Sequence, residues 1–78
     1  MKSIVIELMI PGKLKNEPII CDIIRKFRVD IKIIEASFSA ESGWAIIGVS
    51  GDPEEVDRMC DYLKAKDITI EPQKGMKF

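Results

Sequence analysis

A chain of 78 residues has room for one domain, and at this length folding buries only about 60% of the surface of the unfolded chain. The net charge of −1, from 12 basic and 13 acidic residues, argues against a nucleic-acid-binding protein, which usually carries a basic surplus. The chain has no histidine and only two cysteines, so we expect no metal site, no cofactor and no structural disulfide framework. No apolar run approaches the roughly 20 residues that span a bilayer, so we expect no membrane insertion. The thiols and the lack of a signal-peptide pattern predict a cytoplasmic protein.

The N-terminal segment alternates apolar and other residues, which is typical of a strand over residues 3–10. The stronger apolar set, expected to face the core, is Ile4, Ile6, Leu8 and Ile10. A Pro-Gly pair ends this strand. Asn16 and Pro18 then suit the start of a helix over residues 17–27, whose apolar residues recur at helical spacing.

A second strand is predicted over residues 29–39, but its alternation changes parity at Ile33. Ile34, Ala36 and Phe38 continue the apolar pattern on the opposite face. Either a β-bulge shifts the register there or the strand runs beyond the helices. A short turn leads to a third strand over residues 44–50, which we expect to be its antiparallel hairpin partner.

The clearest local signal is the start of the second helix. Asp52, Pro53 and Glu55 predict an N-cap, a proline in the first helical position and the acid of a capping box. This helix should run to about residue 66. A short strand over residues 68–71 completes a domain of residues 1–73, and residues 74–78 are expected to be a flexible C-terminal tail.

The order of elements predicts an α+β fold, the ferredoxin-like βαββαβ sandwich. Right-handed crossovers place two helices on one face of a four-stranded antiparallel sheet. The other face is not covered and is unusually apolar, which predicts a surface that pairs with a second copy of the chain. The residues expected in this dimer interface are Val5, Met9, Ile34, Phe38, Trp44 and Ile46. The alternative is that a bulge in the second strand returns some of them to the core.

The run from Phe27 to Ile34, the glycines Gly43 and Gly51, and the last strand around Thr69 resemble a NIL domain over nearly the whole chain. The family takes its name from an Asn-Ile-Leu triplet in the second strand. The aligned triplet is Lys32, Ile33 and Ile34, so Lys replaces Asn. The resemblance implies an ACT-like, ferredoxin-like fold, as found at the C-terminus of methionine-importer ATPase subunits. It further implies a homodimer with an amino-acid ligand, such as methionine, held near these three residues.

Two functions follow as hypotheses. The first is a non-catalytic, regulatory, small-ligand-binding module that senses methionine or a related amino acid at a homodimer interface. The alternative is an accessory module that docks an enzyme of sulfur amino-acid metabolism through its open sheet face. Lys32 favours the alternative, because a lysine offers donors and a charge but cannot accept a hydrogen bond from a ligand ammonium as Asn does. Cys21 lacks a neighbouring base, so we do not expect an enzyme that uses this thiol.

Overall fold

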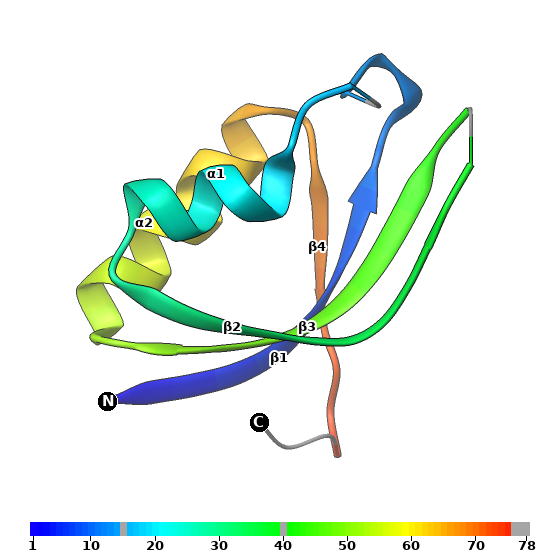
Figure 1. Ribbon diagram of the computed structural model, residues 1–78. Coiled ribbons are helices and arrows are strands. Elements are labelled where there is room, and N and C mark those ends of the chain that lie inside the picture. The colour runs from blue at the N-terminus through cyan, green and yellow to red at the C-terminus, as the bar shows by residue number, and fades with distance from the viewer. Residues whose placement is uncertain (15, 40, 76–78) are drawn as a thin grey trace.

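Four strands and two helices follow one another as β-α-β-β-α-β in the computed structural model, which describes residues 1–14, 16–39 and 41–75 (Figure 1). The strands are β1 (Lys2–Ile10), β2 (Val29–Phe38), β3 (Gly43–Gly51) and β4 (Thr69–Pro72), and the helices are α1 (Ile19–Lys26) and α2 (Pro53–Ala65). The strands form one antiparallel sheet in the order β2-β3-β1-β4. Both helices lie on one side of it, so the predicted ferredoxin-like α+β fold is confirmed. Within the described ranges, neither helix has the length and apolarity needed to cross a membrane.

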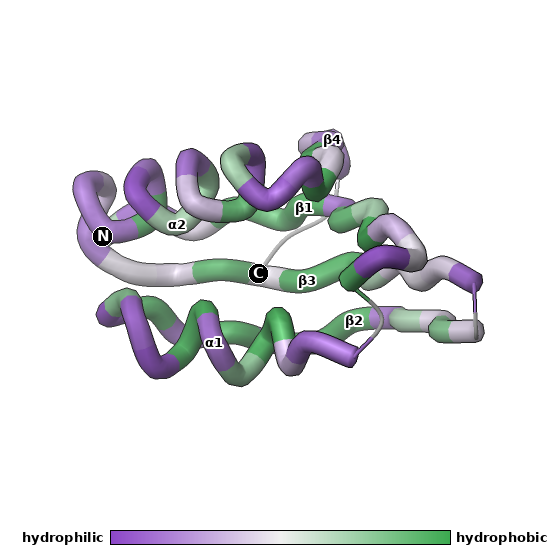
Figure 2. The backbone as a smooth tube through the Cα atoms, turned by 90° about the horizontal axis from the view of Figure 1, so that it is seen from above, coloured by the Kyte–Doolittle hydropathy of each residue, from purple (hydrophilic) through white to green (hydrophobic). Residues whose placement is uncertain are grey.

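The core lies between this sheet and the two helices. Seen from the helix side, α1 runs alongside β2 and α2 alongside β1 and β4, with apolar residues along the strands beneath them (Figure 2). The predicted inward row of β1 is confirmed, since Ile6, Leu8 and Ile10 are buried and Ile4 is partly buried. The largest fully buried side chains are Leu8, Ile23, Ile47, Val49, Val56, Met59 and Leu63.

A β-bulge in β2 explains the change of parity in the sequence. Ile33 pairs with Ile47 but Glu35 pairs with Ile46, so Ile34 is the extra residue. After the bulge, Phe38 pairs with Gly43. Because cross-strand partners share a face of the sheet, the bulge brings Phe38 onto the helix side. The prediction that placed Phe38 and Ala36 on the uncovered face is therefore wrong. The bulge offered as the alternative is present, but it does not return these two residues to the core, since both remain exposed.

β2 also extends well beyond the helix that packs on it. Its 10 residues span about 33 Å, whereas the 8 residues of α1 span only about 12 Å. The part of β2 from Ile33 to Phe38 therefore has no helix above it, and Ile33 and Phe38 are 57% and 60% exposed. Both explanations offered for the β2 sequence hold, because the strand is bulged and also outruns α1.

The helix starts differ in detail from the predicted caps. α1 begins only at Ile19, with Pro18 as the N-cap, and a 3-10 turn over Gly12–Leu14 precedes it. Asn16 is therefore not the cap. α2 begins as predicted, with Asp52 as N-cap and Pro53 in the first position, but no side-chain capping bond forms.

Glu55 takes part in a long-range contact in place of the predicted capping box. Its carboxylate accepts a hydrogen bond from the backbone N–H of Arg28 at 3.0 Å and pairs with the Arg58 guanidinium at 2.7 Å. The Arg28 hydrogen bond is the main reason that the pKa of Glu55 lies below its ordinary value of 4.5. This bond ties the start of α2 to the link between α1 and β2.

We expect Glu55→Gln to make the stability of the protein less dependent on acid pH. A carboxyl whose pKa is lowered by folding stabilises the fold above its unfolded-state pKa, and this contribution is lost as the pH falls below that value. Chemical denaturation at pH 7, 4.5 and 3 should therefore show a steeper acid loss for the parent protein than for Glu55→Gln. Glu54→Gln, which alters an exposed acid in the same helical turn, is the control and should follow the parent. Identical acid profiles for parent and Glu55→Gln would contradict the role of this contact.

Candidate functional site

The three predicted ligand-binding residues lie on β2, which is an edge strand of the sheet. Lys32 pairs with Gly48 on the face that no helix covers, whereas Ile33 pairs with Ile47 on the helix side. Ile34, the extra residue of the bulge, is 37% exposed. The three side chains therefore line the outer edge of the sheet and do not converge on one face.

The uncovered face holds fewer of the predicted interface residues than the sequence suggested. Met9 and Trp44 are cross-strand partners there, with Met9 46% exposed, and Ile46 lies beside them, partly buried. Val5 shares this face but is only 6% exposed. It sits opposite Gly48, and the chain that follows β4 runs beside it, with the Gln73 N–H donating to the Val5 carbonyl at 2.9 Å. Val5 therefore has almost no surface to offer to a partner.

The part of β2 from Ile33 to Phe38 carries most of the exposed apolar surface of the sheet. Ile33, Ile34 and Phe38 are all more than one-third exposed along this one strand. The outer edge of β2 has no neighbouring strand within the described chain. An edge strand with unpaired backbone groups and apolar side chains is a template for another strand. This edge can therefore extend the sheet by pairing with a second chain.

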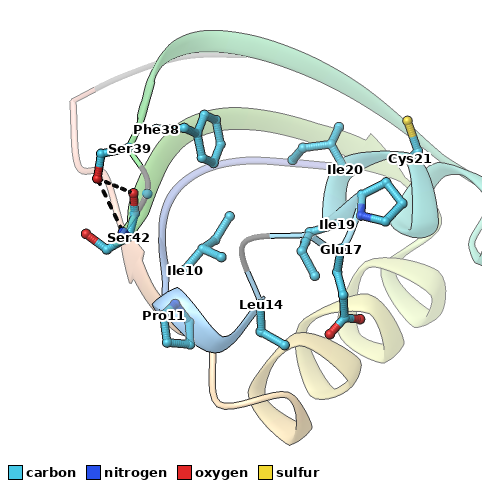
Figure 3. A pocket seen from close by; sticks show the side chains of 12 residues that line it. Ile10, Pro11, Leu14, Glu17, Ile19, Ile20, Cys21, Phe38, Ser39 and Ser42 are labelled. Carbon is cyan, nitrogen blue, oxygen red and sulfur yellow. Dashed lines mark hydrogen bonds between the residues drawn. The ribbon is translucent and has the colours of Figure 1, made fainter.

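A cavity that the sequence did not predict lies on the helix side, near the same end of β2. Its volume is about 250 Å³. Figure 3 shows it between the 3-10 turn, the N-terminal turn of α1 and the end of the β2–β3 hairpin. Its lining residues are Ile10, Pro11, Leu14, Glu17, Pro18, Ile19, Ile20, Cys21, Phe38, Ser39, Ser42 and Gly43. The hollow exists because α1 is too short to cover the space that β2 and β3 enclose.

Two glycines allow the walls of this cavity to approach each other. A Cβ atom on Gly12 would clash with the carbonyl oxygen of Glu41, so the 3-10 turn can pass close to the hairpin only with glycine there. A Cβ atom on Gly43 would clash with the ring of Phe38. Both glycines were visible in the sequence, but only the tertiary arrangement reveals the space that they shape.

Two of the polar side chains around the cavity, Glu17 and Ser39, have partners within the domain. The Glu17 carboxylate accepts a hydrogen bond from Lys66 Nζ at 2.8 Å, and this bond is the main reason that the pKa of Lys66 is raised. Ser39 Oγ donates to the Ser42 carbonyl at 3.1 Å and accepts from the Ser42 N–H at 3.3 Å, which closes the hairpin (Figure 3). The cavity therefore offers mainly carbon surface.

Two ion pairs link the segment between β1 and α1 to the turn that follows α2. Lys13 pairs with Asp67, which holds the pKa of that carboxyl below its ordinary value. Lys66, which precedes Asp67 in the turn after α2, forms an ion pair with Glu17. The segment between β1 and α1 is thus fixed at two points by the turn that follows α2.

The two cysteines lie apart and in different settings. Cys21 is exposed at the rim of the cavity, and Cys60 is partly buried on α2, where burial raises the pKa of its thiol. A raised pKa leaves less reactive thiolate at neutral pH. Across residues 1–14, 16–39 and 41–75, no group of three His, Cys, Asp or Glu side chains could hold a metal ion.

The order of elements and the strand order define a small ferredoxin-like α+β domain with β2 at one edge of its sheet. A family model described as NIL domain matches residues 4–72, and the chain therefore belongs to the NIL domain family.

Comparisons with known proteins connect this family to methionine import. The chain is 30% identical over 67 residues to the methionine import ATP-binding protein MetN of Helicobacter pylori (strain J99 / ATCC 700824), covering 81% of this chain and 20% of that protein. It is 31% identical over 70 residues to the methionine import ATP-binding protein MetN 2 of Bacillus licheniformis, covering 85% and 20%. The chain thus spans about one-fifth of the length of these curated relatives.

A solved structure shares the fold. The crystal structure of the C-terminal domain of an ABC transporter / ATP-binding protein from Enterococcus faecalis matches with a TM-score of 0.77 and 18% identity, covering 94% of this chain and 86% of that one. At this level of identity the match supports the fold alone.

Proposed function

We propose that this chain is a non-catalytic regulatory module of the NIL type that acts in the cytoplasm and binds methionine or a related amino acid between two copies. The observation that carries the proposal is the exposed apolar edge of β2, which coincides with the aligned family triplet Lys32, Ile33 and Ile34. The printed names of the relatives, which describe methionine import, supply the ligand class.

The β2 edge favours a dimer formed by edge pairing over one formed face to face. Phe38 lies on the helix side and Val5 is buried, so neither belongs to a flat patch with Trp44 and Ile46. Two β2 strands that pair across a two-fold axis would instead continue the sheet and cover Ile33 and Ile34 from both copies. This arrangement would also stabilise the domain, because a chain of this size buries only a limited fraction of its surface by folding alone.

Lys32 suits the carboxylate of an amino-acid ligand. Its side chain carries donors and a positive charge, and a charge-assisted hydrogen bond contributes roughly 1.5–3 kcal/mol. We therefore assign Lys32 to the ligand carboxylate and Ile34, the extra residue of the bulge on the same strand edge, to the apolar part of the ligand. Ile33 points to the helix side of the sheet, opposite to Lys32, so we assign it to the contact between the two β2 strands. Ligands that lack a carboxylate should bind poorly at this edge.

Calorimetric titration tests this assignment. L-methionine, L-homocysteine and L-cysteine are titrated into the protein, and at least one should give a saturable heat. Lys32→Gln, which removes the charge, should weaken that ligand at least tenfold, in line with the loss of one charge-assisted hydrogen bond. Lys74→Gln, which removes a lysine from the far end of the described chain, is the matched control and should leave the affinity unchanged. No heat with any of the three amino acids would refute the proposed ligand class.

A second candidate function rests on the uncovered face of the sheet. Met9, Trp44 and Ile46 form an apolar cluster there, which a partner enzyme of sulfur amino-acid metabolism would cover. Affinity capture with the parent chain should then recover one stoichiometric protein that Trp44→Asp fails to recover. Equal recovery by Trp44→Asp and by the parent would exclude this face as the docking surface.

A further inference from the structure

We propose that the cavity between α1, the Gly12–Leu14 turn and the β2–β3 hairpin binds a small uncharged molecule with an aliphatic body. This site is separate from the ligand contact proposed at Lys32, because Lys32, Ile33 and Ile34 do not line it. It would give the domain a second ligand and does not depend on the first.

The size of the cavity limits the ligand. A volume of about 250 Å³ corresponds to roughly eight groups of the size of a water molecule, at about 30 Å³ each. Ligand pockets for drug-sized molecules usually begin near 300 Å³. The occupant is therefore a short chain or a single small ring.

The lining sets the polarity of the ligand. Ile10, Leu14 and Ile19 are buried against the core, and Figure 3 shows Ile20 and Phe38 on opposite sides of the hollow. These side chains offer no hydrogen bond to a ligand. Apolar surface of this kind binds an aliphatic body by removing it from water.

A charged ligand is disfavoured in this cavity. Glu17 is bonded to Lys66 and is itself an acid that repels an anion, and the Ser39 hydroxyl is used within the hairpin, so neither group offers a partner to a carboxylate. Moving an ionised carboxylate from water into an apolar site without a partner is costly. The uncharged member of a pair of otherwise similar molecules should therefore bind better.

The cavity is part of the built structure of the domain. Gly12 and Gly43 allow the chain segments around it to approach closely. The Lys13–Asp67 and Lys66–Glu17 ion pairs link the segment between β1 and α1 to the turn after α2. Phe38, at 60% exposed, forms a wall that a ligand would cover. A ligand would thus bury apolar surface that the isolated chain leaves in water.

Methyl NMR of isoleucine-labelled protein tests the proposal, with hexan-1-ol and sodium hexanoate as probes of equal chain length. Hexan-1-ol should shift the methyl signals of Ile10, Ile19 and Ile20 in a saturable way. The signals of Ile4, Ile24 and Ile70, which do not line the cavity, should stay in place. The Kd of hexan-1-ol should be at least tenfold lower than that of hexanoate.

A pair of variants one helical turn apart on α1 provides the control. Ile20→Phe adds bulk to the cavity and should weaken hexan-1-ol at least fivefold. Ile24→Phe makes the same change at a residue that is 50% exposed and does not line the cavity, so it should bind like the parent. Phe38→Ala, which removes an exposed wall without touching the buried core, should also weaken binding.

Three results would overturn the proposal. One is the absence of saturable shifts at the three cavity isoleucines. Another is equal affinity for hexan-1-ol and hexanoate, which would contradict an uncharged ligand. The third is equal loss of binding in Ile20→Phe and Ile24→Phe, which would place the probe elsewhere on α1.

Discussion

Replacing Ile47 by alanine is expected to lower the free energy of unfolding by about 3 kcal/mol, because it leaves a cavity in the centre of the core. Ile47 has no exposed surface and lies on β3, beneath the helices. A domain of this length has a total stability of roughly 4–12 kcal/mol. The loss would therefore be a large fraction of the total.

The neighbouring residue provides a matched control for this prediction. Ile46 has the same side chain on the same strand but points to the uncovered face, where it is only partly buried. Ile46→Ala should cost about 1 kcal/mol or less, since little buried surface is lost. Urea denaturation of both variants at one protein concentration makes the comparison. Equal losses would mean that the two faces of β3 are assigned incorrectly.

Ile33→Asp is expected to abolish the dimer proposed above while leaving the fold intact. Ile33 is 57% exposed, so a charge there is tolerated by the isolated chain. Within a paired β2 edge the same charge would be buried without a partner, at a cost of about 2 kcal/mol or more per copy, and two copies together would weaken the dimer Kd about a thousandfold or more. Light scattering over a range of protein concentrations should show a single chain for this variant.

Ile24→Asp is the control for the dimer prediction. Ile24 is also an isoleucine that is about half exposed, but it lies on α1, away from the β2 edge. This variant should keep the mass of the parent protein, and circular dichroism should show both variants folded. A dimer that survives Ile33→Asp but not Ile24→Asp would move the interface to the helix layer.

The sequence predicted the order of elements because each element has a strong local signal. The alternation in β1 and the Asp52-Pro53 start of α2 depend on neighbours in the chain, and the structure has both where they are predicted. The family resemblance was also sound, since the NIL domain model matches residues 4–72. The first two features depend only on residues that are neighbours in the chain, and the resemblance depends on a pattern that extends over the whole chain.

The faces of β2 and the cavity depended on tertiary geometry. The parity change after Ile33 was visible, but a bulge and an overhanging strand give the same sequence pattern, so Phe38 was placed on the wrong face. Val5 follows the outward parity yet is buried, which alternation alone does not predict. The cavity arises from the short length of α1 and from two close approaches at Gly12 and Gly43, which no local pattern encodes.

Sedimentation equilibrium with and without L-methionine tests the central claim most directly. A ligand held between two β2 edges must tighten the dimer, because ligand binding and association are linked. The proposal predicts a mass of twice the 8.8 kDa chain, with a dimer Kd that falls as methionine is added. A mass of 8.8 kDa at every concentration, with and without methionine, would contradict it.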